Sequence, residues 1–201
     1  MKALVALALG ALALSVAGLV LLASRSSGDG YLGTRPPATI TLPPFSFTDD
    51  VAETVTTDGL VGKVTVITFL DAQCVDACPV VAWELARAAE SLTAAERAEV
   101  EFLAFSLDPL EDTPEAVDAF LRSRRAKGTL RYLVGPLGEM ERVWDAFQVL
   151  ASADSGDDSL HSVPVRIYGR DGVLRSTLHV ASDLSGEALL HDVRLALGDG
   201  G

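Results

Sequence analysis

The segment GKVTVITFLDAQCVDACPVVAWELARAAESL, residues 62–92, decides the fold of this chain. Its residues 63–70 are mainly apolar and rich in β-branched side chains, without a turn signal, which is typical of a central strand covered on both faces. Residues 79–92 carry apolar side chains at helical spacing. The segment therefore predicts a buried strand, a short loop with two cysteines, and a helix that follows directly.

The alternation of strands and helices continues toward the carboxyl terminus. Thr93 and Glu96 form a capping-box pattern, which predicts a helix start, and residues 100–107 predict a second buried strand. After these we expect, in order, a helix, a strand, a helix, a β-hairpin around an RDG turn and a closing helix, over residues 111–128, 130–135, 137–149, 163–180 and 185–198. This order predicts an α/β fold, a central mixed β-sheet flanked by helices, and resembles a thioredoxin-like fold.

The amino-terminal segment predicts a membrane anchor. Residues 3–23 contain no charged side chain, and at about 1.5 Å per residue they can span a hydrocarbon core of roughly 30 Å. We therefore expect residues 1–25 to form an N-terminal transmembrane helix, with a cleaved signal peptide as the alternative. Residues 26–42 are rich in Gly, Ser, Thr and Pro and predict a flexible linker, so residues 43–201 would form the domain.

Both interpretations of that segment export the domain. Lys2 favours an amino end in the cytoplasm, which gives a single-pass protein of a bacterial-type plasma membrane with its domain on the extracytoplasmic side. The lipid bilayer is then a partner through the N-terminal helix. Asp and Glu outnumber Lys and Arg by 28 to 16, for a formal net charge of −12, and this balance argues against a nucleic-acid partner.

Cys74 and Cys78 are the only cysteines of the chain, and Pro79 follows them. Proline suits the first turn of a helix and disfavours helical angles at the residue before it, so we expect Cys78 at the N-cap and Cys74 in the loop. The positive end of the helix dipole would favour thiolates there. Thiolates serve either disulfide exchange or metal binding. The loop between the two cysteines contains the polar residue Asp76, which makes a purely apolar core role a weaker interpretation.

Two thiolates favour Cu(I) over structural zinc as the bound metal. A structural zinc site needs four ligands, whereas soft thiolates suit Cu(I), for which one imidazole would complete a three-ligand site. His161 precedes the first strand of the predicted hairpin, where a thioredoxin-like fold would bring it beside the cysteine loop. His179 and His191 are expected to be structural. The sequence thus leaves a redox disulfide and a copper site as open alternatives.

These motifs together resemble the Sco/SenC family, the membrane-anchored copper chaperones of cytochrome c oxidase assembly, over residues 43–197. The resemblance is carried by Cys-x-x-x-Cys-Pro with Asp76 inside it, by the Asp-Pro…Asp-Thr-Pro-Glu segment at 108–115, and by His-Ser before a strand and an Asp-Gly turn. It implies copper ligands at Cys74, Cys78 and His161. It also implies transfer of copper to the copper-bearing subunit of the oxidase, or to another copper protein, or reduction of the cysteines in the oxidase's binuclear copper centre.

A metallochaperone is not an enzyme, whereas the second hypothesis is an exported thiol–disulfide oxidoreductase that uses Cys74 and Cys78 as its redox disulfide. Pro164 supports it, because thioredoxins and related reductases carry a cis-proline at the corresponding strand start. A peroxidase would need a threonine and an arginine beside its cysteine, and that setting is absent. Asp76 and Asp108 are considered as further ligands of Cu(II), with no support from spacing.

Overall fold

The computed structural model describes residues 30–37, 39–149 and 163–199. The fold described here is that of the unit Tyr31–Gly201. Its strands are β1 (Ser46–Asp49), β2 (Thr54–Thr56), β3 (Val64–Leu70), β4 (Val100–Ser106), β5 (Arg131–Val134), β6 (Pro164–Tyr168) and β7 (Leu174–His179). Its helices are the 3-10 turn η1 (Asp58–Leu60), α2 (Ala77–Glu90), α3 (Ala94–Ala98), α4 (Pro114–Ser123), α5 (Leu137–Ala146) and α6 (Gly186–Gly198).

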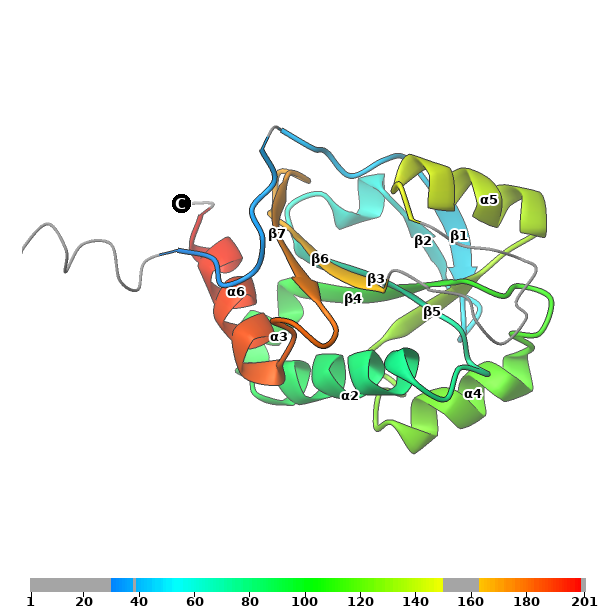
Figure 1. The fold of residues 1–201 in the computed structure, drawn as a ribbon. Helices are drawn as coiled ribbons and strands as arrows, with labels where there is room; N and C mark the ends of the chain where they lie inside the picture. Colours follow the sequence, from blue (N-terminus) through cyan, green and yellow to red (C-terminus); the bar gives the residue numbers. More distant parts are fainter. Residues whose placement is uncertain (1–29, 38, 150–162, 200–201) are drawn as a thin grey trace, which may run out of the picture. The chain divides into compact units, whose positions relative to one another are not determined.

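The described strands form one mixed sheet in the order β2-β1-β5-β4-β3-β6-β7 (Figure 1). The strands β3, β4 and β5 run parallel, whereas β1 pairs antiparallel with β5 and β6 pairs antiparallel with β3. The hairpin predicted over 163–180 is β6 and β7, which pair antiparallel. The predicted α/β architecture is thereby confirmed for the described residues.

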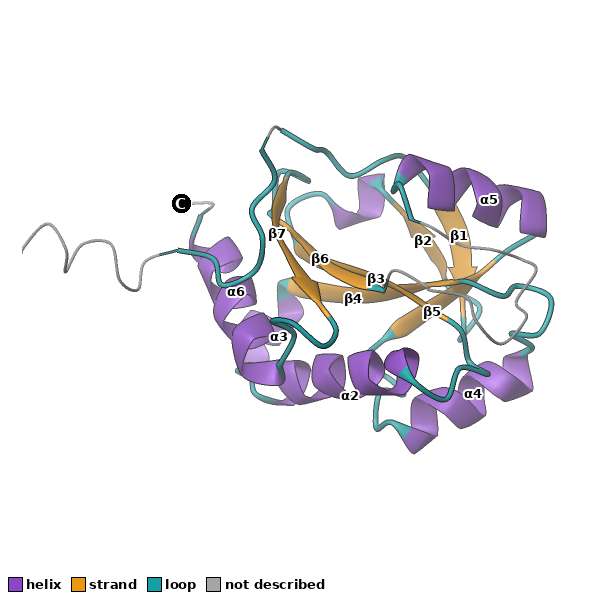
Figure 2. Cartoon of the chain, viewed as in Figure 1, coloured by secondary structure: helices purple, strands orange, loops and turns teal. Residues whose placement is uncertain are grey.

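Strand β3 lies inside the sheet, and all seven of its residues are buried. Its side chains alternate between two hydrophobic clusters: Val66 and Leu70 pack with residues of α2, α4 and α6, whereas Ile67 and Phe69 pack with residues of α5. Figure 2 shows these helices on either side of the sheet. Because both faces are covered, the strand favours apolar or β-branched side chains throughout, and the two polar residues it contains, Thr65 and Thr68, are themselves β-branched and buried.

An aromatic cluster fills the face of the sheet under α5. Phe105 stacks on Phe69 at 5.8 Å between ring centroids and meets Phe45, Phe47 and Phe147 at 5.0, 5.8 and 5.5 Å. Edge-to-face and offset arrangements of this kind add to the free energy of burial. The cluster joins β1 and Phe45 just before it to β3, β4 and the end of α5.

Helix α4 is shorter than predicted, because it ends at Ser123 and not near Gly128. Arg125 has a positive φ of 57°, its N–H donates to Arg122, and the N–H of Ala126 donates to the carbonyl of Leu121. This is a Schellman motif, which normally places glycine at the left-handed position. The expected start is confirmed, since the Thr113 side chain caps the helix. The capping box of Thr93 and Glu96 is present as well.

Residues 31–37 and 39–42, which the sequence predicts as part of the linker, contact the domain. The N–H groups of Leu32 and Gly33 donate to the buried carboxylate of Asp192 at 2.7 and 3.0 Å. Thr34 bridges to Thr177 in β7. A Cβ at Gly33 would lie 2.7 Å from the Thr177 carbonyl oxygen, so only glycine fits this approach. The contacts of the domain therefore begin before the predicted boundary at residue 43.

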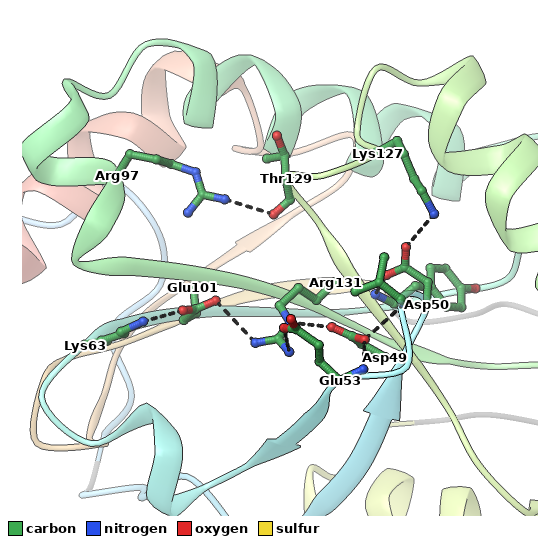
Figure 3. A network of polar contacts seen from close by, with 11 residues as sticks. Asp49, Asp50, Glu53, Lys63, Arg97, Glu101, Lys127, Thr129 and Arg131 are labelled. Carbon is green, nitrogen blue, oxygen red and sulfur yellow. Dashed lines mark hydrogen bonds and ion pairs between the residues drawn. The ribbon is translucent and has the colours of Figure 1, made fainter.

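A network of ion pairs connects β1 and the β1–β2 turn to β5 and β4 (Figure 3). Arg131 contacts the fully buried carboxylate of Asp49 at 2.6 Å and reaches Glu53 and Glu101. Lys63 extends the network to Glu101. Burial alone would raise the pKa of Asp49, but the Glu53 N–H, the Arg131 guanidinium and the Val51 N–H together lower it. The network therefore keeps a buried carboxylate ionised at the sheet edge.

Within the described ranges, no helix is long and apolar enough to cross a membrane. The predicted transmembrane helix over residues 1–25 lies outside those ranges, and it stays a prediction.

We predict that Phe105→Ala lowers the free energy of unfolding by about 4 kcal/mol, because it leaves a cavity amid four other phenylalanines. Urea unfolding followed by circular dichroism measures this. Val61→Ala is the matched control: Val61 is exposed, so the change should stay within about 0.5 kcal/mol. A loss below about 1 kcal/mol for Phe105→Ala would contradict the central position of this ring in the core.

Candidate functional site

The cysteine loop leaves the sheet at the carboxyl end of β3 and leads into α2. Cys74 is half-buried, whereas Cys78 is fully buried, and both are free thiols. The expected N-cap position of Cys78 is wrong: Asp76 is the N-cap, and Cys78 and Pro79 lie in the first turn. Proline is tolerated there because the first N–H groups of a helix lack intrahelical partners in any case.

The two thiols differ in their proton affinity. The pKa of Cys74 is lowered to about 5, chiefly because the Cys78 thiol donates a hydrogen bond to its sulfur, and the N–H groups of Cys78 and Asp76 add to the effect against partial burial. The same hydrogen bond, together with burial, raises the pKa of Cys78 well above its usual range. The lowered pKa favours the thiolate form of the half-buried Cys74 at neutral pH, while the buried Cys78 stays a thiol.

A buried carboxylate holds the loop in front of Cys74. Asp112 accepts a hydrogen bond from the Ala72 N–H at 2.9 Å and another from the Ser106 hydroxyl at 2.6 Å. The Tyr132 hydroxyl lies 2.8 Å from the same carboxylate and 2.7 Å from the Leu70 carbonyl, so its one proton serves two acceptors. Burial raises the pKa of Asp112 to about 6 in spite of these donors. Asp112 thus ties the loop to β4 and β5.

The positioning roles of Asp112 and Tyr132 were missed at the sequence level. Asp112 belongs to the Asp-Thr-Pro-Glu motif, but the motif indicated only a helix start, which Thr113 and Pro114 supply. The signal that could have found it is an additional acidic residue directly before an N-cap that already has its capping side chain. Tyr132 gave no signal, because an aromatic residue in a short strand is ordinary core.

The two aspartates considered as further Cu(II) ligands lie near the loop without forming a site. Asp76 is exposed at the N-cap of α2. Asp108 is half-buried, and its carboxylate accepts weak hydrogen bonds from the N–H groups of Leu110 and Glu111 at 3.3 Å. Within residues 30–37, 39–149 and 163–199 no group of three or more His, Cys, Asp or Glu side chains is placed to hold a metal ion.

His161 lies outside the described residues, so its expected place beside the cysteines stays a prediction. His179 ends β7, where it is exposed and donates its backbone N–H to Asp183. His191 lies on α6, with its Nδ1 3.0 Å from the Asp192 carboxylate. These two histidines thus contact neighbours on their own segments, which agrees with the structural roles expected for them.

Pro164 is the first residue of β6 and pairs in register with His179. No peptide bond in the described part of the chain is cis, and the bond before Pro164 belongs to that part. The cis-proline considered in favour of a reductase is therefore not found.

Comparison with known proteins decides the family. The SCO1/SenC sequence profile matches residues 33–197, which is most of the chain. This chain belongs to the SCO1/SenC family. The match begins ahead of residue 43, and so includes part of the leading segment that contacts β7 and α6.

Individual SCO1/SenC relatives agree with this assignment. A Stutzerimonas stutzeri protein named "Putative copper-binding protein" is 27% identical over 152 residues, 72% of each chain. The copper-bound structure of ScoI from Bradyrhizobium japonicum is 25% identical, with a TM-score of 0.64 over 77% of this chain and 98% of that one. BsSco, described as a Sco-family cytochrome c oxidase assembly protein with a disulfide switch, shares the fold at 22% identity and a TM-score of 0.68, over 81% of this chain and 96% of that one.

We predict that Cys78→Ala raises the apparent pKa of Cys74, because the hydrogen bond from Cys78 is the largest cause that lowers it. The rate of iodoacetamide alkylation against pH measures this, with a midpoint near 5 in the native chain that moves upward in the variant. Cys78→Ser is the matched control, since its hydroxyl can still donate and the midpoint should move less. Equal midpoints in all three chains would exclude this cause.

We predict a second pH effect, on stability. Since the pKa of Asp112 is raised to about 6 in the folded state, its contribution is present at pH below the unfolded value of 3.8 and is lost as pH rises through 6. The difference of about two pKa units corresponds to about 3 kcal/mol. Asp112→Asn should therefore flatten the curve of unfolding free energy between pH 4 and 6, as measured by urea unfolding. A curve of unchanged slope would contradict the raised pKa.

Proposed function

We propose that this chain is a copper metallochaperone in which the thiolates of Cys74 and Cys78 and the imidazole of His161 hold copper as cargo. The observation that carries the proposal is the placement of two free cysteines four positions apart, Cys74 in the loop after β3 and Cys78 in the first turn of α2, where each thiol shifts the pKa of the other. Its second support is membership of the SCO1/SenC family, in which the Bradyrhizobium japonicum relative has a copper-bound structure.

The donor set fits Cu(I) better than other metals. Two adjacent thiolates and one imidazole make a soft three-ligand site, while structural zinc would need a fourth ligand. Metal binding must remove the remaining proton from Cys78, whose pKa is raised. A bound cation compensates for that cost, because a coordinating thiol is deprotonated outright. The loop contact between Asp112 and Ala72 would keep Cys74 in place during this change.

The proposed client is the copper-bearing subunit of cytochrome c oxidase or another copper protein. The description of BsSco as a cytochrome c oxidase assembly protein supports this direction. We further propose that residues 1–25 anchor the chain in a bacterial-type plasma membrane and that the domain works on the extracytoplasmic side. In that setting the chain passes copper on, or reduces the cysteines of the binuclear copper centre, and need not be an enzyme.

The asymmetry of the two thiols favours a second candidate, an exported thiol–disulfide oxidoreductase. A half-exposed thiolate beside a buried thiol is the arrangement of an attacking and a resolving cysteine. The disulfide switch described for BsSco is consistent with such chemistry in a protein of the same fold. His161 separates the two candidates, because copper binding needs it and disulfide exchange does not.

We predict that the reduced chain binds one Cu(I) tightly, and that the double change Cys74→Ser with Cys78→Ser abolishes binding. His161→Ala should weaken binding by at least about tenfold, since it removes one of three ligands. Competition with a chromophoric Cu(I) chelator measures the affinity. Because the ligands must lose protons, the affinity should fall as pH decreases.

His179→Ala and His191→Ala are the matched controls and should bind Cu(I) as the native chain does. Binding that is indifferent to His161, or equal losses in all three histidine variants, would overturn the three-ligand site. The oxidoreductase would then be the better account of Cys74 and Cys78.

A further inference from the structure

The surface around the cysteine loop combines apolar and acidic side chains. Three large apolar residues stand out from it: Val75 is 94% exposed, Leu110 is 66% exposed and Val80 is 48% exposed. Val75 lies between the cysteines, Val80 is in the first turns of α2, and Leu110 is in the loop after β4. Exposed apolar groups that gather at a reactive group mark an interaction surface more often than scattered ones do.

The sheet brings these residues to one place. Because β3 and β4 are parallel and Leu70 pairs with Ser106, the loops that follow them leave the same edge of the sheet (Figure 1). The N–H of Leu107 donates to the Leu70 carbonyl at 2.8 Å, and Ala72 donates to Asp112 at 2.9 Å. The two loops are therefore bonded to each other. We call Val75, Val80 and Leu110 the loop rim.

The carboxylates of these two loops are not neutralised by ion pairs within the described part of the chain. Several acidic side chains elsewhere do pair with arginine or lysine, as Asp49, Asp118 and Glu101 do. Four carboxylates beside the loop rim form no ion pair within the described part of the chain: Asp71, Asp76, Asp108 and Glu111. An apolar surface beside an unneutralised negative field complements a partner that is apolar and basic.

A positive charge lies on the α2 side of this surface. The Arg125 guanidinium lies over the ring of Trp83 at 5.7 Å, one turn after Val80 along α2. Basic groups of a partner would be repelled on that side and attracted on the side of Leu110 and Glu111. A second copy of this chain is a poor occupant, because its own rim is acidic and its net charge is −12.

We propose that the loop rim docks an apolar, lysine- or arginine-flanked cysteine segment of a partner protein and brings it to Cys74. The inference rests on the proposed function in one respect, namely that the thiols act on another protein. It adds the chemistry of that partner, and it holds for delivery of copper and for disulfide exchange alike.

Peptide disulfides provide the probe. The full chain, reduced and held in phosphatidylcholine nanodiscs, is mixed with symmetric disulfides of the acetylated, amidated peptides KLCLK, ELCLE or KSCSK. The Cys74 thiolate attacks one peptide sulfur, the peptide S–S bond breaks and one peptide leaves as a thiol. Cys78 then loses its proton and attacks the Cys74 sulfur, so that the second peptide thiol leaves. The chain is oxidised to a disulfide, and one peptide disulfide is reduced to two thiols.

At low salt, KLCLK should react at least about tenfold faster than ELCLE and several-fold faster than KSCSK, and 0.5 M NaCl should remove most of the difference from ELCLE. Val75→Ser combined with Leu110→Ser should abolish the faster reaction of KLCLK relative to KSCSK. The control Val61→Ser, at a residue that is also well exposed but remote from the cysteines, should retain it. Glu111→Gln should reduce the advantage over ELCLE, while Glu141→Gln on α5 should not.

Dividing each rate by that for 2-hydroxyethyl disulfide removes changes in the intrinsic reactivity of Cys74. Equal rates for the three peptides in the native chain, or ratios unchanged in the rim variants, would overturn the proposal. Cu(I) affinity measured on the same variants separates the two proposals. Copper binding without peptide preference would leave the metallochaperone standing and remove the docking surface, and the reverse result would remove only the copper site.

Discussion

The three hydrogen bonds of the buried Asp112 carboxylate are the contacts on which the position of the cysteine loop depends. They join the backbone of the loop at Ala72 to Ser106 in β4 and Tyr132 in β5. A carboxylate is costly to bury, and its raised pKa shows that the three donors offset the cost only in part. The chain keeps this costly group where it transfers the rigidity of the sheet to the loop. Cys74 is thus positioned by the central strands and not by the loop alone.

The two proposed activities make different demands on the same pair of thiols. Disulfide exchange needs one thiolate at a time, and the lowered pKa of Cys74 beside the raised pKa of Cys78 is suited to that. Copper binding needs both thiolates together, which only the charge of the metal can make favourable. The metal-free pair is therefore suited to exchange chemistry. Copper binding as proposed would release the Cys78 proton to solvent and so suppress that chemistry. One pair of cysteines could then serve both proposed functions, because the proton on Cys78 distinguishes them.

The parts of the fold that could be predicted are those that leave a local pattern. Strand β3 was recognisable because burial on both faces favours a continuous run of apolar and β-branched side chains. The starts of α3 and α4 were recognisable because helix caps use few residue types. The end of α4 could not be predicted, since Arg125 at a left-handed position has no compositional signature. The role of Asp112 could not be predicted either, because its partner Ala72 lies forty residues away in the chain and leaves no periodic pattern. The cysteines were found from spacing, and the ligand role of His161 remains a prediction.

The segment around Leu32 and Gly33, which Asp192 binds, limits how far the domain can lie from the proposed anchor. Once Leu32 and Gly33 are bonded to the domain, the chain left between the proposed anchor at residues 1–25 and the first clamped residue is short. At about 3.5 Å per extended residue, the greatest span of the tether drops from about 60 Å for residues 26–42 to about 21 Å for residues 26–31. If residues 1–25 anchor the chain as proposed, a tether this short would confine the domain to a thin layer above the bilayer. Its clients would then have to present their copper sites close to the membrane surface, and a high local concentration there would replace long-range search.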